Sequence, residues 1–156
     1  MKVRIEQKSG DTEDEVVIIC GKIDERIRRI HQYILEQASG APELTFYKDG
    51  REYYFPLDDV LFFETDGEHV YAHTARDAYR IRYRLYELEE LLPSAFVRAA
   101  KSAIVNTARV YSVTRNLAAS SLVTFADSHK QVYVSRHYYN DVRRRLSDRN
   151  ARGPGD

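Results

Sequence analysis

The chain has 156 residues, 43% of them hydrophobic and 31% charged, and its 24 basic and 24 acidic side chains give a formal net charge of zero. This length fits one domain with a small extension, and the composition excludes a largely disordered chain. The longest apolar run, residues 16–20, is too short for a membrane span, and no secretory signal follows Lys2 and Arg4. The single cysteine, Cys20, cannot form an internal disulfide, so we expect a soluble cytoplasmic protein without membrane insertion.

The zero net charge hides an uneven distribution. Residues 1–45 hold seven basic against nine acidic side chains, residues 46–90 hold six against eleven, and residues 91–156 hold eleven against four. A polyanion responds to the field within about a Debye length, roughly 8–10 Å, and not to the total charge. The second half therefore either presents a basic surface or is neutralised by the acidic middle, and the sequence leaves both open.

The N-terminal segment predicts a small unit of two strands and a helix. Residues 2–7 alternate polar and apolar, residues 15–20 are a second strand candidate, and Asp24 is a suitable N-cap. A helix stripe follows at three- and four-residue spacing, formed by Ile27, Ile30, Ile34 and Leu35.

Residues 39–42, Ser-Gly-Ala-Pro, end this helix, which defines a head of residues 1–43. So short a unit buries little core by itself, so its apolar stripe needs a partner. We expect the head to mediate homodimerisation, with Cys20 as an inert core thiol.

From residue 44 the pattern changes to short strands separated by turns. Asp49-Gly50 between two strand-like runs predicts a type I′ hairpin, and Asp66-Gly67 marks another turn. Short helices are expected at residues 85–92 and 136–149. The strand candidates are residues 45–48, 51–55, 60–64, 68–74, 79–84, 96–98, 103–105, 110–114, 122–125 and 131–134. We therefore predict a mainly β (α+β) domain over residues 44–148 and a disordered tail over residues 149–156.

The motifs of common enzymes are absent from the sequence. There is no glycine-rich phosphate loop and no nucleophile elbow. His69 and His73 would share one strand face, but surface histidines are a better interpretation than a metal site because no third ligand lies nearby in sequence. The carboxylates Asp58, Asp59 and Glu64 do not promise the opposed environments that acid–base chemistry needs. We expect no catalysis, no metal, no cofactor and no small-molecule substrate.

The basic second half contains three features of recognition chemistry. Polar residues interrupt the apolar strand pieces of residues 96–106, and Asn106 is expected to satisfy backbone groups in its turn. Ser135 is a candidate N-cap, which would aim a helix N-terminus, Arg136 and His137 at one place. The basic run 143–145 lies on the terminal helix, where a solvated face is the more common role. For the earlier alternating arginines Arg80, Arg82 and Arg84, the expected partners are Glu52, Glu64 and Glu68.

The pieces just described occur in the order and spacing of one family. From Leu44 to Leu146 the chain resembles the LytTR DNA-binding domain of bacterial response regulators. The matching residues are 58–64 (Asp-Asp-Val-Leu-Phe-Phe-Glu), 84–89 (Arg-Leu-Tyr-Glu-Leu-Glu), 96–98 (Phe-Val-Arg), 102–106 (Ser-Ala-Ile-Val-Asn) and 134–136 (Val-Ser-Arg). The resemblance implies an elongated fold of about ten short strands with short helices. It also implies binding of double-stranded DNA through loops that enter successive major grooves.

Carried onto this chain, the resemblance implies DNA contacts in three loops. The implied loop residues are Glu68, His69, Lys101, Ser102, Arg136 and His137. We add Arg98 and, on the terminal helix, Asn140 and Arg143 as expected contacts to the DNA backbone. Two positions depart from the family, which commonly has histidine in place of Ala100 and a basic or amide residue near Glu68. An anionic Glu68 is unfavourable beside DNA unless it accepts from a cytosine amino group, so the other two loops are the better candidates.

Only about 43 residues precede the LytTR-like region, too few for a receiver domain, so the chain is similar to stand-alone LytTR regulators. We interpret it as a sequence-specific DNA-binding transcriptional regulator that is not an enzyme. An alternative is a protein-interaction module on the same scaffold with DNA binding weakened or lost, which Glu68, Ala100 and the zero net charge favour. An RNA-binding β module would need exposed aromatic side chains for stacking.

Overall fold

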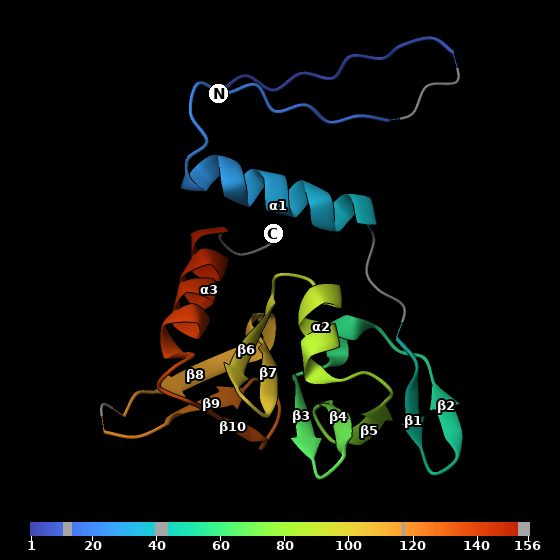
Figure 1. Ribbon diagram of the computed structural model, residues 1–156, viewed down its shortest axis with the longest axis vertical. Helices are drawn as coiled ribbons and strands as arrows, with labels where there is room; N and C mark the ends of the chain where they lie inside the picture. Colours follow the sequence, from blue (N-terminus) through green and yellow to red (C-terminus); the bar gives the residue numbers. More distant parts are fainter. Residues whose placement is uncertain (11–13, 40–43, 117, 153–156) are drawn as a thin grey trace. The chain divides into compact units, whose positions relative to one another are not determined.

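A computed structural model describes residues 1–10, 14–39, 44–116 and 118–152 (Figure 1). By internal contacts the chain divides into two units, Met1–Leu35 and Glu36–Asp156. Over the described residues it forms ten strands and three α-helices, so the mainly β fold predicted from the sequence is confirmed. Within the same residues, no helix combines the length and the apolar character that crossing a membrane requires.

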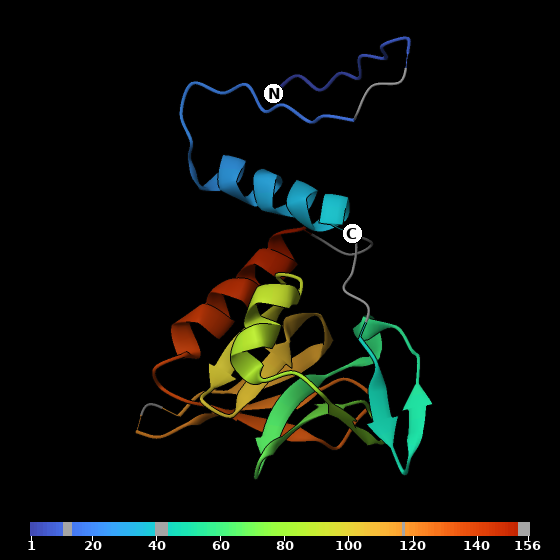
Figure 2. The ribbon, with the colours of Figure 1, turned by 45° about the vertical axis from the view of Figure 1, so that its right-hand side comes forward.

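The first unit begins with two extended segments that run alongside each other without forming a sheet (Figures 1 and 2). Neither predicted strand, residues 2–7 or 15–20, is present. Val3, Ile5 and Ile19 are 88%, 95% and 89% exposed. An alternating pattern marks the face that a strand could bury, but a strand also needs a hydrogen-bonded neighbour. Cys20 is exposed as well, so the expected core thiol is wrong.

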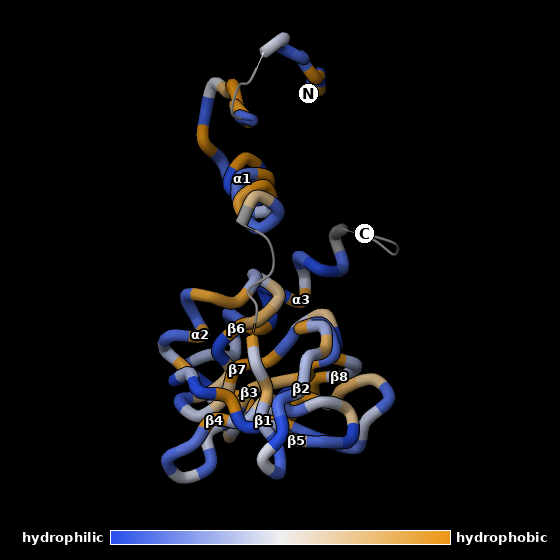
Figure 3. Tube along the Cα trace, turned by 90° about the vertical axis from the view of Figure 1, so that its right-hand side faces the viewer, coloured by the Kyte–Doolittle hydropathy of each residue, from blue (hydrophilic) through white to orange (hydrophobic). Residues whose placement is uncertain are grey.

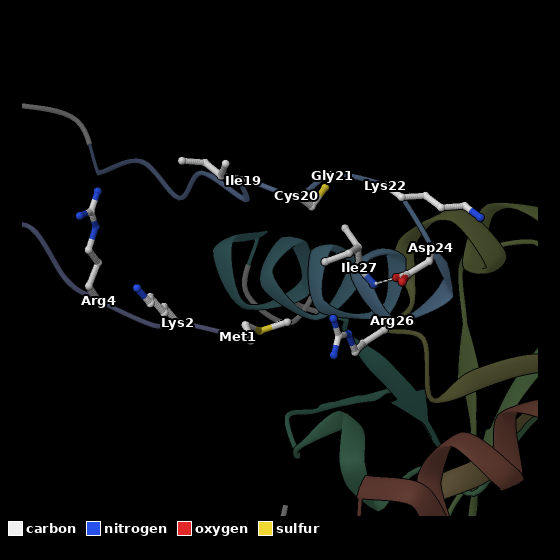
Figure 4. A pocket seen from close by; sticks show the side chains of 10 residues that line it. All are labelled: Met1, Lys2, Arg4, Ile19, Cys20, Gly21, Lys22, Asp24, Arg26 and Ile27. Carbon is white, nitrogen blue, oxygen red and sulfur yellow. Dashed lines mark hydrogen bonds between the residues drawn. The ribbon is translucent and has the colours of Figure 1, made fainter.

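Helix α1 (Glu25–Ser39) starts as its sequence predicts. The Ile27 backbone N–H donates to Asp24 Oδ1 at 3.0 Å, which confirms Asp24 as the N-cap (Figure 4). Ile27 is buried, whereas Tyr33 is 51% and Leu35 45% exposed. A pocket of about 520 Å³ in this unit is lined by Met1, Cys20 and Ile27, among others (Figure 4). The hydropathy trace of Figure 3 shows hydrophobic stretches along these N-terminal residues.

The second unit contains two antiparallel sheets. One has seven strands in the order β2-β1-β5-β4-β3-β7-β6, and the other has three in the order β10-β9-β8. The seven are β1 (Phe46–Lys48), β2 (Arg51–Tyr53), β3 (Phe62–Asp66), β4 (His69–His73), β5 (Ala78–Ile81), β6 (Phe96–Ala100) and β7 (Ala103–Asn106). The three are β8 (Val110–Thr114), β9 (Ser121–Phe125) and β10 (Gln131–Val134); the helices of this unit are α2 (Leu85–Leu91) and α3 (Tyr139–Arg152).

The first two residues of β3 and the whole of β7 are buried and lie between two hydrophobic cores. Phe62 and Val105 face one core, which the three-stranded sheet and Val142 of α3 complete. Phe63 and Ile104 face the other core, which α2 covers. This explains why Phe62-Phe63 and residues 103–105 are apolar without alternation. Neighbouring positions on one strand thus stabilise different halves of the domain.

The C-terminal helix differs from its predicted position. It starts at Tyr139 instead of Arg136 and extends to Arg152. Ser135 is therefore not its N-cap, and the predicted disordered tail is wrong for residues 149–152, while residues 153–156 lie outside the described residues. The helix is longer than expected because Arg149 anchors its last turns, donating from Nη1 to the carbonyls of Val110, at 2.9 Å, and Thr107.

Three local predictions can be compared directly with the structure. The hairpin at Asp49-Gly50 is confirmed by φ values of 52° and 74°, as a type I′ turn requires. Asn106 is buried in its turn, donating to the Val60 carbonyl at 2.9 Å and accepting from the Ala108 N–H at 3.1 Å, as expected. The arginine ladder is wrong: among the described residues no ion pair joins it to the three glutamates, and Arg82 lies 4.1 Å above the Tyr47 ring.

A polar cluster joins the β9–β10 turn to the β4–β5 turn. Lys130 Nζ lies 3.2 Å from His73 Nδ1 and also donates to the Asp77 carbonyl, while the Asp77 carboxylate binds Lys48 at 2.7 Å. His73 stacks on Phe62 with ring centroids 4.3 Å apart. Burial, reinforced by the charge of Lys130, lowers the pKa of His73 to about 4. The ring is therefore neutral at physiological pH.

Candidate nucleic-acid interface

The sequence-predicted contact residues fall in or beside three turns of the second unit. Gly67 (φ 63°) and exposed Glu68 connect β3 to β4, and half-buried His69 is the first residue of β4. Lys101 and Ser102, both exposed, connect β6 to β7. Residues 135–138 connect β10 to α3 and include exposed Arg136 and His137. The other two, Asn140 and Arg143, are exposed on α3.

Hydrogen bonds hold the first two turns together. The Thr65 backbone N–H donates to the Ser102 carbonyl at 2.9 Å, and the Thr65 hydroxyl donates to the same carbonyl at 3.3 Å. Thr65 lies two residues before Gly67. The tip of the β6–β7 turn is therefore fixed beside the end of β3 and its turn.

A second hydrogen bond fixes the third turn. The Ser135 N–H donates to the Ala99 carbonyl at 2.8 Å, two residues before Lys101. The β10–α3 turn therefore lies beside the strand that leads into the β6–β7 turn. These bonds are all made to backbone carbonyls, so they position the turns without using the exposed side chains of Lys101, Arg136 and His137.

Arg98, expected at the DNA backbone, has an internal role in this structure. Its Nε donates to the Ala100 carbonyl at 2.7 Å, Nη2 donates to the Lys101 carbonyl, and Nη1 pairs with Glu89 at 3.1 Å. The guanidinium thus braces the β6–β7 turn from within. Arg98 is a positioning residue for Lys101, and its charge is compensated by a carboxylate.

Two exposed arginines of the predicted set have no carboxylate partner among the described residues. These are Arg136 and Arg143. Two other exposed arginines are paired with carboxylates: Arg109 with Asp59 at 3.5 Å, and Arg144 with Asp141 at 3.9 Å. Arg136 in the third turn and Arg143 on α3 are therefore available to an external anion, as is exposed Lys101 in the second turn.

The first turn has the opposite character. Asp66 and Glu68 are both exposed there. Burial, together with the charge of Asp66, raises the pKa of nearby Glu64. The negative field of these carboxylates is unfavourable for a phosphate at this turn.

Ser135 does not cap the helix as predicted. Its hydroxyl is buried and has no hydrogen-bond partner within the described part of the chain, while its carbonyl accepts from the Tyr138 N–H at 3.1 Å. A turn of residues 135–138 therefore separates β10 from α3. The side chain of His137 contacts Tyr138 edge to face, with centroids 4.8 Å apart.

Sequence reasoning missed three residues of this region. Thr65 holds the β6–β7 turn, Glu89 holds Arg98, and Arg115 lies over the Tyr139 ring. The first two contacts join residues distant in sequence and leave no local signal. A signal existed for Arg115, because residues 91–126 hold four basic side chains and no carboxylate.

A two-histidine metal site at His69 and His73, the less favoured interpretation of the sequence, finds no support in the geometry. His73 Nδ1 faces Lys130 at 3.2 Å, an ammonium that repels a metal cation. Across the described residues no group of three or more His, Cys, Asp or Glu side chains could hold a metal ion.

Comparison with known proteins supplies independent findings. The sequence model of the LytTr DNA-binding domain matches residues 50–147, which include all three turns. A solved structure described as the LytTr DNA-binding domain of a putative methyl-accepting/DNA response regulator from Bacillus cereus has the same fold. Its TM-score is 0.62 at 23% identity, covering 68% of this chain and 98% of that one.

Similar full-length proteins come from Staphylococcus aureus. An uncharacterized HTH-type transcriptional regulator of strain NCTC 8325 is 29% identical over 149 residues, which cover 94% of this chain and 99% of the relative. A protein with the same description from strain MRSA252 is 28% identical with the same coverage. The similarity therefore includes the N-terminal unit as well as the sheet domain.

Proposed function

The chain belongs to the LytTr DNA-binding domain family, and on this basis we propose that it is a sequence-specific transcriptional regulator that binds double-stranded DNA. The observation that supports this best is the joining of three turns by the Thr65–Ser102 and Ser135–Ala99 hydrogen bonds. Two of these turns present exposed cations, at Lys101 and Arg136. The protein acts by binding, in the cytoplasm, and needs no cofactor or small-molecule substrate.

Recognition has two components in this proposal. Lys101, Arg136 and His137 read base edges in the major groove, where lysine and arginine fit the O6 and N7 acceptors of guanine. Ser102, beside Lys101 in the second turn, adds a polar contact to the DNA. The turns enter successive major grooves, so the site contains half-sites about one helical turn, roughly 10 base pairs, apart. Glu68 and His69 contribute less, because the first turn is acidic.

Helix α3 contacts the DNA backbone and does not serve as a recognition helix. Val142 is buried in the core and Leu146 packs against it, so the inner face of α3 is occupied. Asn140 and Arg143 lie on its exposed side. The similar staphylococcal proteins are described as HTH-type, but here the strands β6 to β10 separate α2 from α3. Phosphate contacts from α3 raise affinity without specifying sequence.

The N-terminal head, residues 1–43, mediates homodimerisation in this proposal. The motivating observation is the exposure of Val3, Ile5 and Ile19. Contact between such large apolar side chains and water is unfavourable, and burial against a second copy would remove it. A dimer would double the pattern of half-sites on DNA.

The test is selection from a random duplex library with the purified full chain, followed by a salt titration on the enriched site. We expect a motif with half-sites about one turn apart and a log–log salt slope near −0.9 for each phosphate contacted. No enrichment together with little salt dependence would overturn the proposal. That outcome would favour the alternative of a protein-interaction module, which the acidic pair Asp66 and Glu68 supports.

A further inference from the structure

A basic site outside the three turns lies where the β8–β9 loop meets α3. The guanidinium carbon of Arg115 lies 4.9 Å from the ring centroid of Tyr139. From the next turn of the helix, Arg143 Nη1 donates to the Tyr139 hydroxyl at 3.4 Å. One tyrosine thus holds two guanidinium groups from segments that are distant in sequence.

The base of this site is fixed. Tyr139 is half-buried and packs against the core that β3 and β7 share with the three-stranded sheet. The loop after Arg115 is held by Asn116, whose side chain accepts from the Ala118 N–H at 3.0 Å and whose own N–H donates to Ser121 Oγ at 3.4 Å. The two arginines therefore start from an ordered platform, which reduces the entropy lost when an anion is bound.

The charges at the site are uncompensated. Neither Arg115 nor Arg143 pairs with a carboxylate among the residues that the structure describes, and the neighbouring acid Asp141 pairs with Arg144 at 3.9 Å. Two guanidinium groups on one ring repel each other, and an anion between them would remove that repulsion. No hydrogen bond within the described residues uses the guanidinium N–H donors of Arg115, so they can bind phosphate oxygens.

We propose that Arg115 and Arg143, held by Tyr139, form a clamp for a phosphate of the DNA backbone. Tyr139 and Arg143 follow Arg136 and His137 by only a few residues, so the clamp grips the strand flanking the bases that the third turn reads. The proposal rests on the DNA-binding function above. It adds a contact from the β8–β9 loop, outside the three loops that the family resemblance implies, and this contact sets affinity and not sequence preference.

The test uses the full chain with Arg115→Gln, measured on the site selected by the parent. We expect the log–log salt slope to become less steep by about 0.9, one phosphate contact, with an unchanged selected sequence. The matched control is Arg51→Gln, which removes the same charge from exposed β2, an edge strand of the seven-stranded sheet, whereas Arg115 follows β8 of the three-stranded sheet. The control should leave the slope at the parent value.

A second variant tests the role of the ring. Tyr139→Leu keeps an apolar side chain in the core but removes the platform, so it should reproduce most of the Arg115→Gln effect, and the double variant should add little. Parent-like salt slopes for Arg115→Gln, with binding by the parent intact, would overturn the clamp alone. Failure of the parent to bind any duplex would overturn the proposed function and the clamp together.

Discussion

At the scale of single residues, the candidate interface contains side chains that hold the turns in place and side chains that are exposed. Arg98 and Arg136 are both arginines of the basic half. Arg98 donates hydrogen bonds to two backbone carbonyls and pairs with Glu89, whereas Arg136 is exposed in its turn. Residue type and net charge do not distinguish them, because the difference lies in contacts made across strands.

Arg136→Ala is expected to weaken binding to the selected site by about 1–3 kcal/mol and to relax discrimination at one base position, because a bidentate guanine contact is lost. Competition binding against single-base variants of the site measures both effects. Arg144→Ala on α3 is the comparison, since Arg144 pairs with Asp141 and should change affinity little. An equal loss on every sequence would reassign Arg136 to a phosphate.

At the scale of secondary structure elements, most local signals predicted well, although the N-cap at Ser135 did not, and signals that depend on a distant partner failed. The Asp49-Gly50 hairpin, the Asp24 cap and strands β8 and β10 follow from residues that adjoin in sequence. The head strands failed because no neighbouring strand completes a ladder. For the candidate site, the sequence and the resemblance located the turns, but the contacts of Arg98 and Arg115 depend on packing that no local pattern records.

Arg98→Met tests the bracing of the β6–β7 turn. The variant keeps an unbranched side chain but loses the hydrogen bonds to the Ala100 and Lys101 carbonyls and the pair with Glu89, so we expect a loss of roughly 1–3 kcal/mol in stability. Affinity for the site should fall while the salt slope stays at the parent value. A slope less steep by about 0.9 would instead identify Arg98 as a phosphate contact.

The polar cluster of His73, Asp77 and Lys130, which joins the β4–β5 turn to the β9–β10 turn, leads to a prediction about the pH dependence of stability. His73 titrates near pH 4 in the fold and at 6.5 in the unfolded chain. Below pH 6.5 the His73 side chain therefore binds a proton in the unfolded chain but stays neutral in the folded chain. The free energy of unfolding consequently decreases as the pH falls from 6.5 towards 4. At about pH 5 the loss should be roughly 1 kcal/mol, allowing for partial solvent screening.

Urea unfolding at several pH values measures this loss. His73→Phe keeps a ring to stack on Phe62 and removes the titrating group, so its stability should decline less over the same range. Parallel declines in the two proteins would show that other groups dominate. Because the polar cluster joins the two sheets, the loss of stability at low pH should affect unfolding of the whole domain and not of one strand alone.

At the scale of the whole molecule, the two units of the chain differ in how far they bury their apolar side chains. The second has two cores of its own, while the first exposes most of its large apolar side chains. The length match with the staphylococcal proteins, at 99% of the relative, indicates that such a head accompanies the sheet domain there as well. This arrangement is the basis for the proposed homodimer.

The dimer is expected to dissociate when the exposed apolar residues of the head are charged. Sedimentation of the full chain should give a dimer, and Ile5→Lys with Ile19→Asp should give a monomer with an unchanged sheet domain, because these side chains are 95% and 89% exposed. A chain that begins at Ala41 should also be a monomer. Monomers for both the full chain and the shortened one at high micromolar concentration would refute the dimer.

The hydrogen bonds from Thr65 and Ser135 to the carbonyls of Ser102 and Ala99 have a further consequence. A peptide carbonyl is the same whatever side chain its residue bears, so the turns keep their places when Lys101, Ser102, Arg136 or His137 is replaced. Under the proposed function, binding preference would diverge by substitution at these exposed positions while the backbone hydrogen bonds that join the turns are kept. The domain is thus a scaffold suited to retargeting, in evolution or in the laboratory, by exchanging a few side chains at its turns.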